Sequence, residues 1–242
     1  MKEVSFRGIK LHAGSYEDAL GCVLDIVLNG KTGKIITHIN LRNYFYLMRD
    51  DGLKEILGNN GTMFFEGIGM KIGFFLKGRG IIPDVNGTDL FPLLMKSLSG
   101  CPYRIYLLGS VLQAAEGVAD KIRNAYPSVN IAGIHSGYFD EKTDDDIVSD
   151  INNKNTDILI AAMGFPVQEK FAFRNLNRLN VKAVWCTGGL FDFISGMKKR
   201  APRFVRTLRL EWLYRFLKEP KRMLHRNTIA AFWSLFDIIF RN

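Results

Sequence analysis

The sequence predicts an α/β fold built on a doubly wound, mostly parallel sheet, with a basic helical appendage at its C-terminal end. Short apolar runs alternate along the chain with longer segments of helical periodicity, which is the rhythm of strand–helix–strand units. Several of these runs are almost continuously apolar, as expected for strands buried on both faces of a parallel sheet. After Gly196 the chain becomes basic and aromatic, so we divide it into a core, 1–195, and an appendage, 196–242.

Six short runs are expected to form the strands of the core. Their residues are 35–39, 62–65, 104–108, 130–134, 157–163 and 182–187. The opening segment EVSFRGIKLH is typical of a small hairpin. No internal repeat or low-complexity tract interrupts the order, so the core is interpreted as one domain.

Helical patterns lie between the predicted strands. Ser15 can cap the segment SYEDALGCVLDIVLN, and Asp18 three residues later completes a capping-box pattern. Thr88 is expected to cap a second helix, TDLFPLLMKSL. The pattern LQAAEGVADKIRNAY predicts a third helix that stops before Pro127.

Composition indicates a globular protein of the cytosol. Hydrophobic residues make up 47% of the 242 residues, which suits a sizeable core. Neither a secretory signal nor an uncharged apolar run of about 18 residues is visible, so a membrane-spanning helix is not expected. The three cysteines, Cys22, Cys101 and Cys186, are widely spaced and odd in number, which favours reduced thiols over a disulfide framework.

Basic charge is concentrated in one segment of the chain. Eleven basic and two acidic residues lie between Lys198 and Arg226, and this excess equals the net charge of +9 of the whole chain. A helix is expected over 203–218, and Pro220 interrupts it. We call 198–226 the basic segment.

The last helical pattern, NTIAAFWSLFDIIF, has two different faces. One carries Ile229, Phe232, Trp233, Phe236, Ile239 and Phe240, and the other carries Ala230, Ser234, Asp237 and Arg241. One interpretation is a C-terminal helix docked on its own core. The other is an interfacial helix that touches anionic lipid headgroups beside the basic segment.

Open α/β sheets bind ligands beyond the carboxyl ends of their strands. The loops expected there are THIN (37–40), EGIGM (66–70), GS (109–110), HSGYF (135–139), MGFPVQEK (163–170) and TGGLFDF (187–193). In MGFPVQEK, Gly164 and Pro166 can form a turn. Gln168 and Glu169 then open a helix whose free N–H groups favour an anion. An ordinary strand–turn–helix junction is the alternative interpretation.

Glu66 is a single carboxylate at the end of an apolar run, directly before Gly67 and Gly69. The two glycines allow backbone and substrate to approach closely, which suits a general base. The alternative is a polar residue at the rim of a loop.

Other ligand classes have weaker support. GIGMKIG is close to the dinucleotide fingerprint but has the wrong final spacing, which disfavours a nicotinamide or flavin enzyme. The aspartates at 144–146 fit an acidic first helical turn better than a metal motif. The four histidines are scattered, so no metal site is supported. The basic segment accompanies apolar tail residues rather than strand-borne aromatics, which disfavours nucleic acid.

The chain also resembles a known family. The segments that carry the resemblance are NGTDLF, IYLLGS, IHSGYF, DILIAAMGFPVQEK and TGGLFDFISGMKKRAPRFVRTLRLEWLYRFLKEPKR. Together, over about residues 15–226, they resemble the WecG/TagA/CpsF family of bacterial glycosyltransferases. The resemblance implies a Rossmann-like core and metal-free, inverting transfer of a sugar from a UDP-linked donor. It implies a polyprenyl-diphosphate-linked saccharide as acceptor, at the cytoplasmic face of the membrane, and peripheral attachment there to an anionic surface.

The resemblance implies three groups of site residues. The catalytic group comprises Glu66, His38, Thr37 and Gln168. The donor and nucleotide group comprises Asn40, Gly109, Gly164, Glu169, Gly188, Gly189, Phe191 and Asp192. The acceptor diphosphate group comprises Arg215, Arg222 and Arg226, since arginine pairs bidentately with phosphate oxygens. No metal or other cofactor is expected, and a homo-oligomer is left open.

Three positions depart from the pattern of the family. Glu66-Gly67 stands where the family has Asp-Gly, His38 stands at a usual threonine, and Asp84 replaces a residue that is often basic. These changes leave the donor open between an N-acetylmannosamine type, a hexose and a uronic acid. A non-catalytic relative that binds nucleotide sugar or scaffolds a polysaccharide complex is the alternative. The carboxylate retained at Glu66 favours an enzyme.

Overall fold

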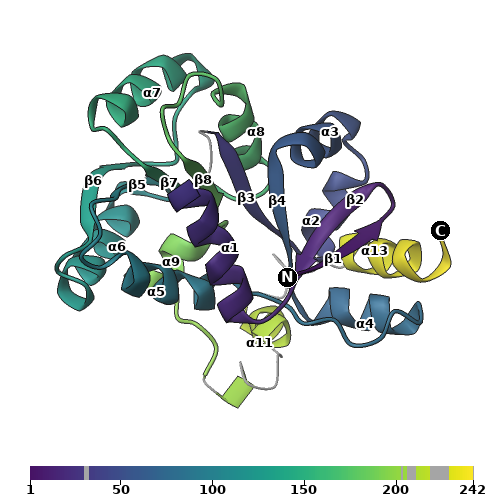
Figure 1. Ribbon diagram of the computed structural model, residues 1–242. Coiled ribbons are helices and arrows are strands. Elements are labelled where there is room, and N and C mark those ends of the chain that lie inside the picture. Colours follow the sequence, from purple (N-terminus) through teal and green to yellow (C-terminus); the bar gives the residue numbers. More distant parts are fainter. Residues whose placement is uncertain (30–32, 203, 206–210, 219–228, 242) are drawn as a thin grey trace.

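The computed structural model describes residues 1–29, 33–202, 204–205, 211–218 and 229–241 (Figure 1). These residues form an eight-stranded sheet in the order β1-β2-β4-β3-β8-β7-β5-β6. The strands are β1 (Lys2–Phe6), β2 (Ile9–Ala13), β3 (Lys34–Ile39), β4 (Gly61–Phe65), β5 (Arg104–Gly109), β6 (Asn130–His135), β7 (Ile158–Ala162) and β8 (Ala183–Cys186). Only the β1–β2 pair is antiparallel among these strands, so the predicted mostly parallel α/β fold is confirmed.

Helices cover both faces of the sheet (Figure 1). They are α1 (Tyr16–Asn29), α2 (Leu41–Leu47), α3 (Asp51–Asn60), α4 (Ile68–Leu76), α5 (Gly87–Leu98), α6 (Leu112–Ala125), α7 (Asp144–Asn153), α8 (Val167–Arg174), α9 (Leu190–Ser195), α11 (Glu211–Lys218) and α13 (Ile229–Phe240). A short 3₁₀ turn, Glu141–Thr143, precedes α7.

Two apolar clusters lie on opposite faces of the sheet. Ile35 of β3 belongs to the cluster that includes side chains of α2, α3, α4, α7 and α8. Its neighbour Ile36 belongs to the cluster that includes side chains of α1, α5, α6 and α9. Successive side chains of a strand point to opposite faces, so a nearly continuous apolar run fills both layers.

The strand predictions are confirmed to within one or two residues at each end. The opening hairpin is also confirmed, and its second strand adds to the main sheet by pairing in parallel with β4. The capping box at the start of α1 is present: the Asp18 N–H donates to Ser15 Oγ over 3.1 Å, and the Ser15 N–H donates to Asp18 Oδ2 over 2.9 Å.

The expected cap of α5 is wrong by two residues. The N-cap is Asn86, whose Oδ1 accepts the Thr88 N–H over 2.9 Å, and the helix begins at Gly87. An asparagine side chain reaches the backbone two residues ahead and closes the turn before Thr88 can act as the cap.

The acidic first turn of α7 is confirmed. Asp144 Oδ2 lies 3.0 Å from Arg174 Nη2, and Asp145 Oδ1 lies 2.6 Å from Arg178 Nη2. These aspartates therefore tie α7 to the segment that contains α8.

The C-terminal helix α13 docks on α2 and α4 through the face that the sequence marks as polar. Ser234 Oγ donates to the Leu41 carbonyl over 2.8 Å, and Tyr44 Oη donates to the buried Asp237 Oδ2 over 2.6 Å. Phe232 and Phe236, on the apolar face, stay exposed. Docking on the core is thus confirmed. Trp233 of the apolar face packs against Tyr44 and Phe45 of α2, whereas the phenylalanines of that face point outward. Within the described ranges, no helix combines the length and apolar character needed to cross a bilayer.

Candidate active site

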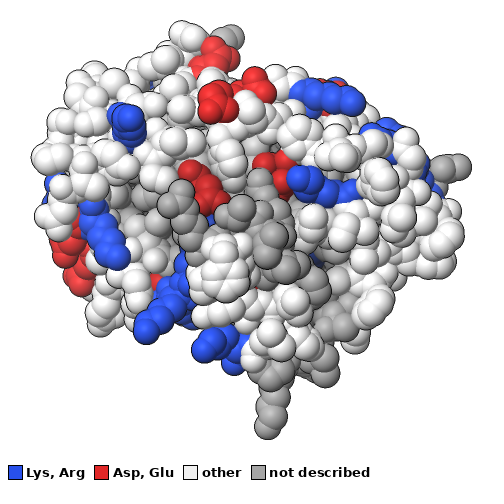
Figure 2. Space-filling view, turned by 90° about the horizontal axis from the view of Figure 1, so that it is seen from below, with Lys and Arg blue, Asp and Glu red and all other residues white. Residues whose placement is uncertain are grey.

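The carboxyl ends of β3, β4, β5, β7 and β8 lie at one edge of the sheet, because these strands are parallel. In Figure 1 this is the lower edge, where β4 leads down into α4. Figure 2 shows the molecule from that side, with acidic and basic side chains close together near the middle of the face. We call this edge the candidate active site.

Glu66 stands at the end of β4, beside the end of β3, since its N–H donates to the Ile39 carbonyl over 3.1 Å. Its side chain is mostly buried, with 18% exposed. Asn86 Nδ2 donates to Glu66 Oε1 over 2.9 Å. Asn86, the cap of α5, therefore also orients the predicted base. Asn86 is not among the site residues predicted from the sequence, although its position directly before Gly87-Thr88-Asp89 could have indicated it.

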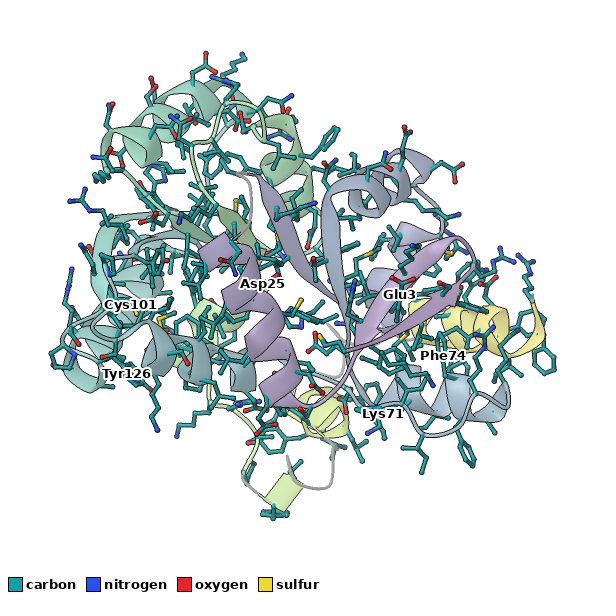
Figure 3. The ribbon with its side chains drawn as sticks, viewed as in Figure 1. Glu3, Asp25, Lys71, Phe74, Cys101 and Tyr126 are labelled. Carbon is teal, nitrogen blue, oxygen red and sulfur yellow. The ribbon has the colours of Figure 1, made fainter. Side chains whose placement is uncertain are left out.

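The turn after Glu66 is held by Asp84. Gly67 has a φ of +92°, a conformation that favours glycine, and its N–H donates to Asp84 Oδ2 over 3.2 Å. Lys71 Nζ lies 3.1 Å from Asp84 Oδ1, and Figure 3 labels Lys71 at the start of α4. The unusual acidic residue at position 84 thus fixes the backbone that presents Glu66.

His38 lies in the interior, next to Glu66. Its Nε2 accepts the indole N–H of Trp185 over 3.0 Å, so in the neutral ring Nδ1 carries the proton. Nδ1 lies 3.2 Å from the Val85 carbonyl and 3.8 Å from Glu66 Oε2. Burial lowers the pKa of His38 to about 4. The ring is therefore neutral near pH 7. Its position suits a role in orienting Glu66 rather than in transferring a proton.

Thr37 points to the opposite face of β3 from His38. Its hydroxyl donates to Glu169 Oε1 over 2.6 Å, and Gln168 Nε2 donates to the same oxygen over 2.9 Å. Burial raises the pKa of the Glu169 carboxyl, while both hydrogen bonds act to lower it. Thr37 and Glu169 thus join β3 to α8 inside the fold.

Gln168 connects two loops of the candidate active site. Its Oε1 accepts the N–H groups of Gly164, over 3.1 Å, and of Gly188, over 3.0 Å. The loops after β7 and β8 therefore hold a fixed spacing. Asn40 caps α2 by accepting the Asn43 N–H over 3.1 Å.

The loop after β5 contacts α9, the helix that follows β8, through Asp192. Ser110 Oγ donates to Asp192 Oδ1 over 2.5 Å, and Lys198 Nζ pairs with Asp192 Oδ2. A side chain on Gly109 would collide with the backbone of Ala162, so that the close approach of these two strand ends requires glycine. Ser110 and Lys198 were not among the predicted site residues.

Two predicted donor residues differ in their surroundings. Phe191 is fully buried in the apolar cluster that includes α5 and α6, so its side chain packs in the core. Gly189 is the N-cap of α9, at the same edge as Gly188.

The predicted acceptor residues are only partly within the described structure. Arg222 and Arg226 lie outside the described residues, and Arg215 belongs to α11. Arg200 connects the start of α11 to α5. Its guanidinium donates to the two carboxylate oxygens of Asp89 in α5 over 2.6 and 3.0 Å, and its Nε lies 3.5 Å from Glu211 Oε2 at the start of α11. The helix that carries Arg215 therefore begins beside the N-terminal turn of α5. Among the described residues, no group of three or more His, Cys, Asp or Glu side chains could hold a metal ion.

The fold places this chain among Rossmann-like α/β proteins, a class that binds its ligands beyond the carboxyl ends of the strands. The family model described as "Glycosyl transferase WecG/TagA/CpsF family" matches residues 4–241. The chain belongs to this family and is a glycosyltransferase.

Three relatives carry the same name, N-acetylglucosaminyldiphosphoundecaprenol N-acetyl-beta-D-mannosaminyltransferase. The protein of Bacillus subtilis (strain 168) is 33% identical over 201 residues, which cover 81% of this chain and 77% of the relative. That of Bacillus spizizenii is 27% identical over 195 residues, 81% of this chain and 75% of the relative. That of Staphylococcus aureus (strain MRSA252) is 30% identical over 148 residues, which cover 61% of this chain and 58% of the relative.

Proposed function

We propose that this enzyme transfers a sugar, with inversion, from a UDP-sugar to a polyprenyl-diphosphate-linked saccharide in the synthesis of a bacterial surface polysaccharide. The names of the relatives support a lipid-diphosphate acceptor and a donor of the N-acetylmannosamine type. A hexose or a uronic acid remains in the proposal, because the site differs from the family pattern at Glu66, His38 and Asp84. The enzyme would work at the cytoplasmic face of the membrane.

One observation carries the proposal: Glu66 is held at the carboxyl end of β4 by Asn86 on its side chain and by Asp84 on the following turn. A general base must present its carboxylate in a fixed direction toward the hydroxyl that it deprotonates. Lys71 and Asp84 form an ion pair, so Asp84 adds little net negative charge beside the base.

The chemical step then balances as follows. The acceptor hydroxyl oxygen bonds to the anomeric carbon of the donor, and the bond from that carbon to the β-phosphate oxygen of UDP breaks. The hydroxyl proton moves to the Glu66 carboxylate, and UDP leaves with the electron pair. A single displacement inverts the anomeric carbon. Basic residues near the leaving group would stabilise its negative charge, and Lys71, Lys198 and Arg200 lie around this edge of the sheet.

The basic segment is proposed to bind the acceptor. Arg215 follows Glu211 by one helical turn in α11, whose start lies beside α5. Arginine binds diphosphate bidentately, so Arg215, Arg222 and Arg226 are proposed to hold the lipid diphosphate.

The test is release of UDP from a panel of UDP-sugars in the presence of a polyprenyl-diphosphate-linked N-acetylglucosamine. The wild-type enzyme should turn over one donor much faster than the others, and Glu66→Gln should not. The matched control is Glu17→Gln, which removes an exposed carboxylate from α1. Binding of a UDP-sugar without any release of UDP would instead favour a non-catalytic scaffold.

A further inference from the structure

The sequence of α4, IGMKIGFFL, contains one charged residue, Lys71. It lies in the first turn of the helix, close behind Glu66 in the chain. Its side chain is 23% exposed, so the ammonium group is partly withdrawn from solvent. A lysine usually extends its charged head into water, so the position of this one requires a partner within the fold.

Asp84 holds the ammonium group at the turn that follows Glu66. Lys71 Nζ lies 3.1 Å from Asp84 Oδ1, and Asp84 Oδ2 accepts the Gly67 N–H over 3.2 Å. One carboxylate therefore joins the cation to the first backbone N–H after Glu66. The Asp84 side chain is only 3% exposed, so the cation is the more accessible member of the pair. A substrate at the edge of the sheet meets the positive charge rather than the negative one.

The first turn of α4 is packed closely against its neighbours. A Cβ on Gly69 would collide with the side chain of Leu41, the first residue of α2. Glycine at this position therefore allows α4 to begin directly beside the helix that follows β3. In Figure 3 Lys71 lies toward the lower edge of the molecule, which is the carboxyl edge of the sheet. Lys71 is thus presented from a fixed helix end next to the ends of β3 and β4.

Lys71 retains hydrogen-bonding capacity for a ligand. An ammonium group has several N–H donors, and within the described residues the Lys71 side chain hydrogen-bonds to Asp84 alone. The other cations of this edge are placed differently. Arg200 donates to both carboxylate oxygens of Asp89. Lys198 pairs with Asp192 after β8, which is two strands away from β4 in the sheet.

We propose that Lys71 is a catalytic residue that binds the β-phosphate of the donor. The inference rests on the proposed function, in which the bond between the anomeric carbon and the β-phosphate oxygen breaks. The electron pair of that bond stays on the oxygen, and the ammonium group donates a hydrogen bond to the phosphate without giving up its proton. A cation held in place before the reaction stabilises the charge that develops there.

The place of Lys71 favours the donor phosphate over other anions. Glu66 takes the proton of the hydroxyl that attacks the anomeric carbon, and the leaving oxygen is bonded to the same carbon. The diphosphate of the acceptor is separated from that hydroxyl by a sugar ring. Position 84, which is often basic in the family, is acidic here. In this chain the positive charge therefore comes from α4, and Asp84 holds it.

The experiment is calorimetric titration of the full chain with UDP and with UMP, in the absence of any sugar or lipid. Lys71→Met removes the charge and keeps the length of the side chain. A second variant combines Lys71→Met with Asp84→Asn, so that no buried carboxylate is left unpaired and the amide oxygen can still accept the Gly67 N–H. Lys96→Met, which removes an exposed lysine from the last turn of α5, is the matched control. Thermal melting establishes that each variant is folded.

Both variants that lack Lys71 should bind UDP roughly ten- to a hundredfold more weakly, because a charged hydrogen bond to the β-phosphate is lost. Their affinity for UMP should stay nearly unchanged, since UMP has no β-phosphate. Lys71→Arg should keep part of the UDP affinity, and Lys96→Met should bind both nucleotides like the wild type. In turnover of the preferred donor, kcat should fall with the loss of Lys71.

Wild-type affinity for UDP in the double variant would overturn the inference, because Lys71 would then serve only as the partner of Asp84. Equal losses of UDP and UMP affinity would also overturn it. So would a raised KM for the acceptor with unchanged UDP affinity, which would assign Lys71 to the acceptor diphosphate. The titrations need no turnover, so the two proposals can fail separately. If the wild type releases UDP from no donor while Lys71 still controls UDP affinity, the proposed function fails and the phosphate contact stands.

Discussion

Trp185 donates its indole N–H to Nε2 of His38 over 3.0 Å, and both side chains are buried between the sheet and α5. This bond fixes the tautomer and the direction of the imidazole. The protonated Nδ1 then faces the Val85 carbonyl and lies near Glu66. A histidine that stands at a usual threonine of the family therefore has a structural partner of its own.

This pair predicts that stability depends on pH. The pKa of His38 is about 4 in the folded protein and 6.5 without burial, so the unfolded chain binds the proton more readily. The contribution of the neutral, buried His38 side chain to the free energy of unfolding is fully present above about pH 6.5. It is lost as the pH falls toward 4. The free energy of unfolding should decrease by at most about 3 kcal/mol over this window.

Urea unfolding at pH 7 and pH 4.5 measures this loss. His38→Gln should flatten the dependence, and His12→Gln, a change in β2 away from Trp185, should leave it in place. An unchanged slope in the His38 variant would assign the dependence to other groups.

Glu66→Gln tests the base. The amide keeps the shape and most hydrogen bonds but cannot accept the proton, so turnover should fall by roughly 10²–10⁴-fold. UDP affinity and melting temperature should stay nearly unchanged. Glu66→Asp, the residue usual in the family, should keep part of the activity. If the glutamine variant turns over near the normal rate, the base is another group, and Asp192 is the next carboxylate to test.

Thr37→Val tests the internal link between β3 and α8. It removes a hydroxyl that donates to the buried Glu169 carboxylate over 2.6 Å. The free energy of unfolding should fall by about 1–3 kcal/mol, because a buried carboxyl group loses a hydrogen bond. Thr37→Ser keeps the hydroxyl and is the control. Equal stability of the two variants in urea would show that the bond contributes little.

Arg222→Ala tests acceptor binding. Loss of one charged hydrogen-bonding partner is typically worth about 1.5–3 kcal/mol, which is roughly ten- to a hundredfold in use of the acceptor. Arg215→Ala should act in the same way, and UDP binding should be little affected by either. Calorimetry with UDP and kinetics over a range of acceptor concentrations separate the two effects. If a variant loses UDP affinity and use of the acceptor to the same extent, that arginine belongs to the donor site instead.

Much of the fold was predictable because its signals are local. Apolar runs located six strands, and the Ser15–Asp18 pattern located the start of α1. The position of Glu66 at a strand end followed from the same reasoning, since parallel strands place their carboxyl ends together. Local patterns failed at α5, where Asn86 competes with Thr88 for the cap.

The sequence by itself determined the order of the strands, the family, and most of the loops at the carboxyl edge, but not the helices α2, α3 and α4. Only the tertiary structure decided which side chains meet there. Asn86 reaches Glu66, and Trp185 reaches His38 from 147 positions away, through contacts that no local periodicity encodes. The direction of α13 has the same origin. Amphipathicity marks two faces of a helix, but buried polar partners on α2 decide which face docks, because a buried polar group must be hydrogen-bonded.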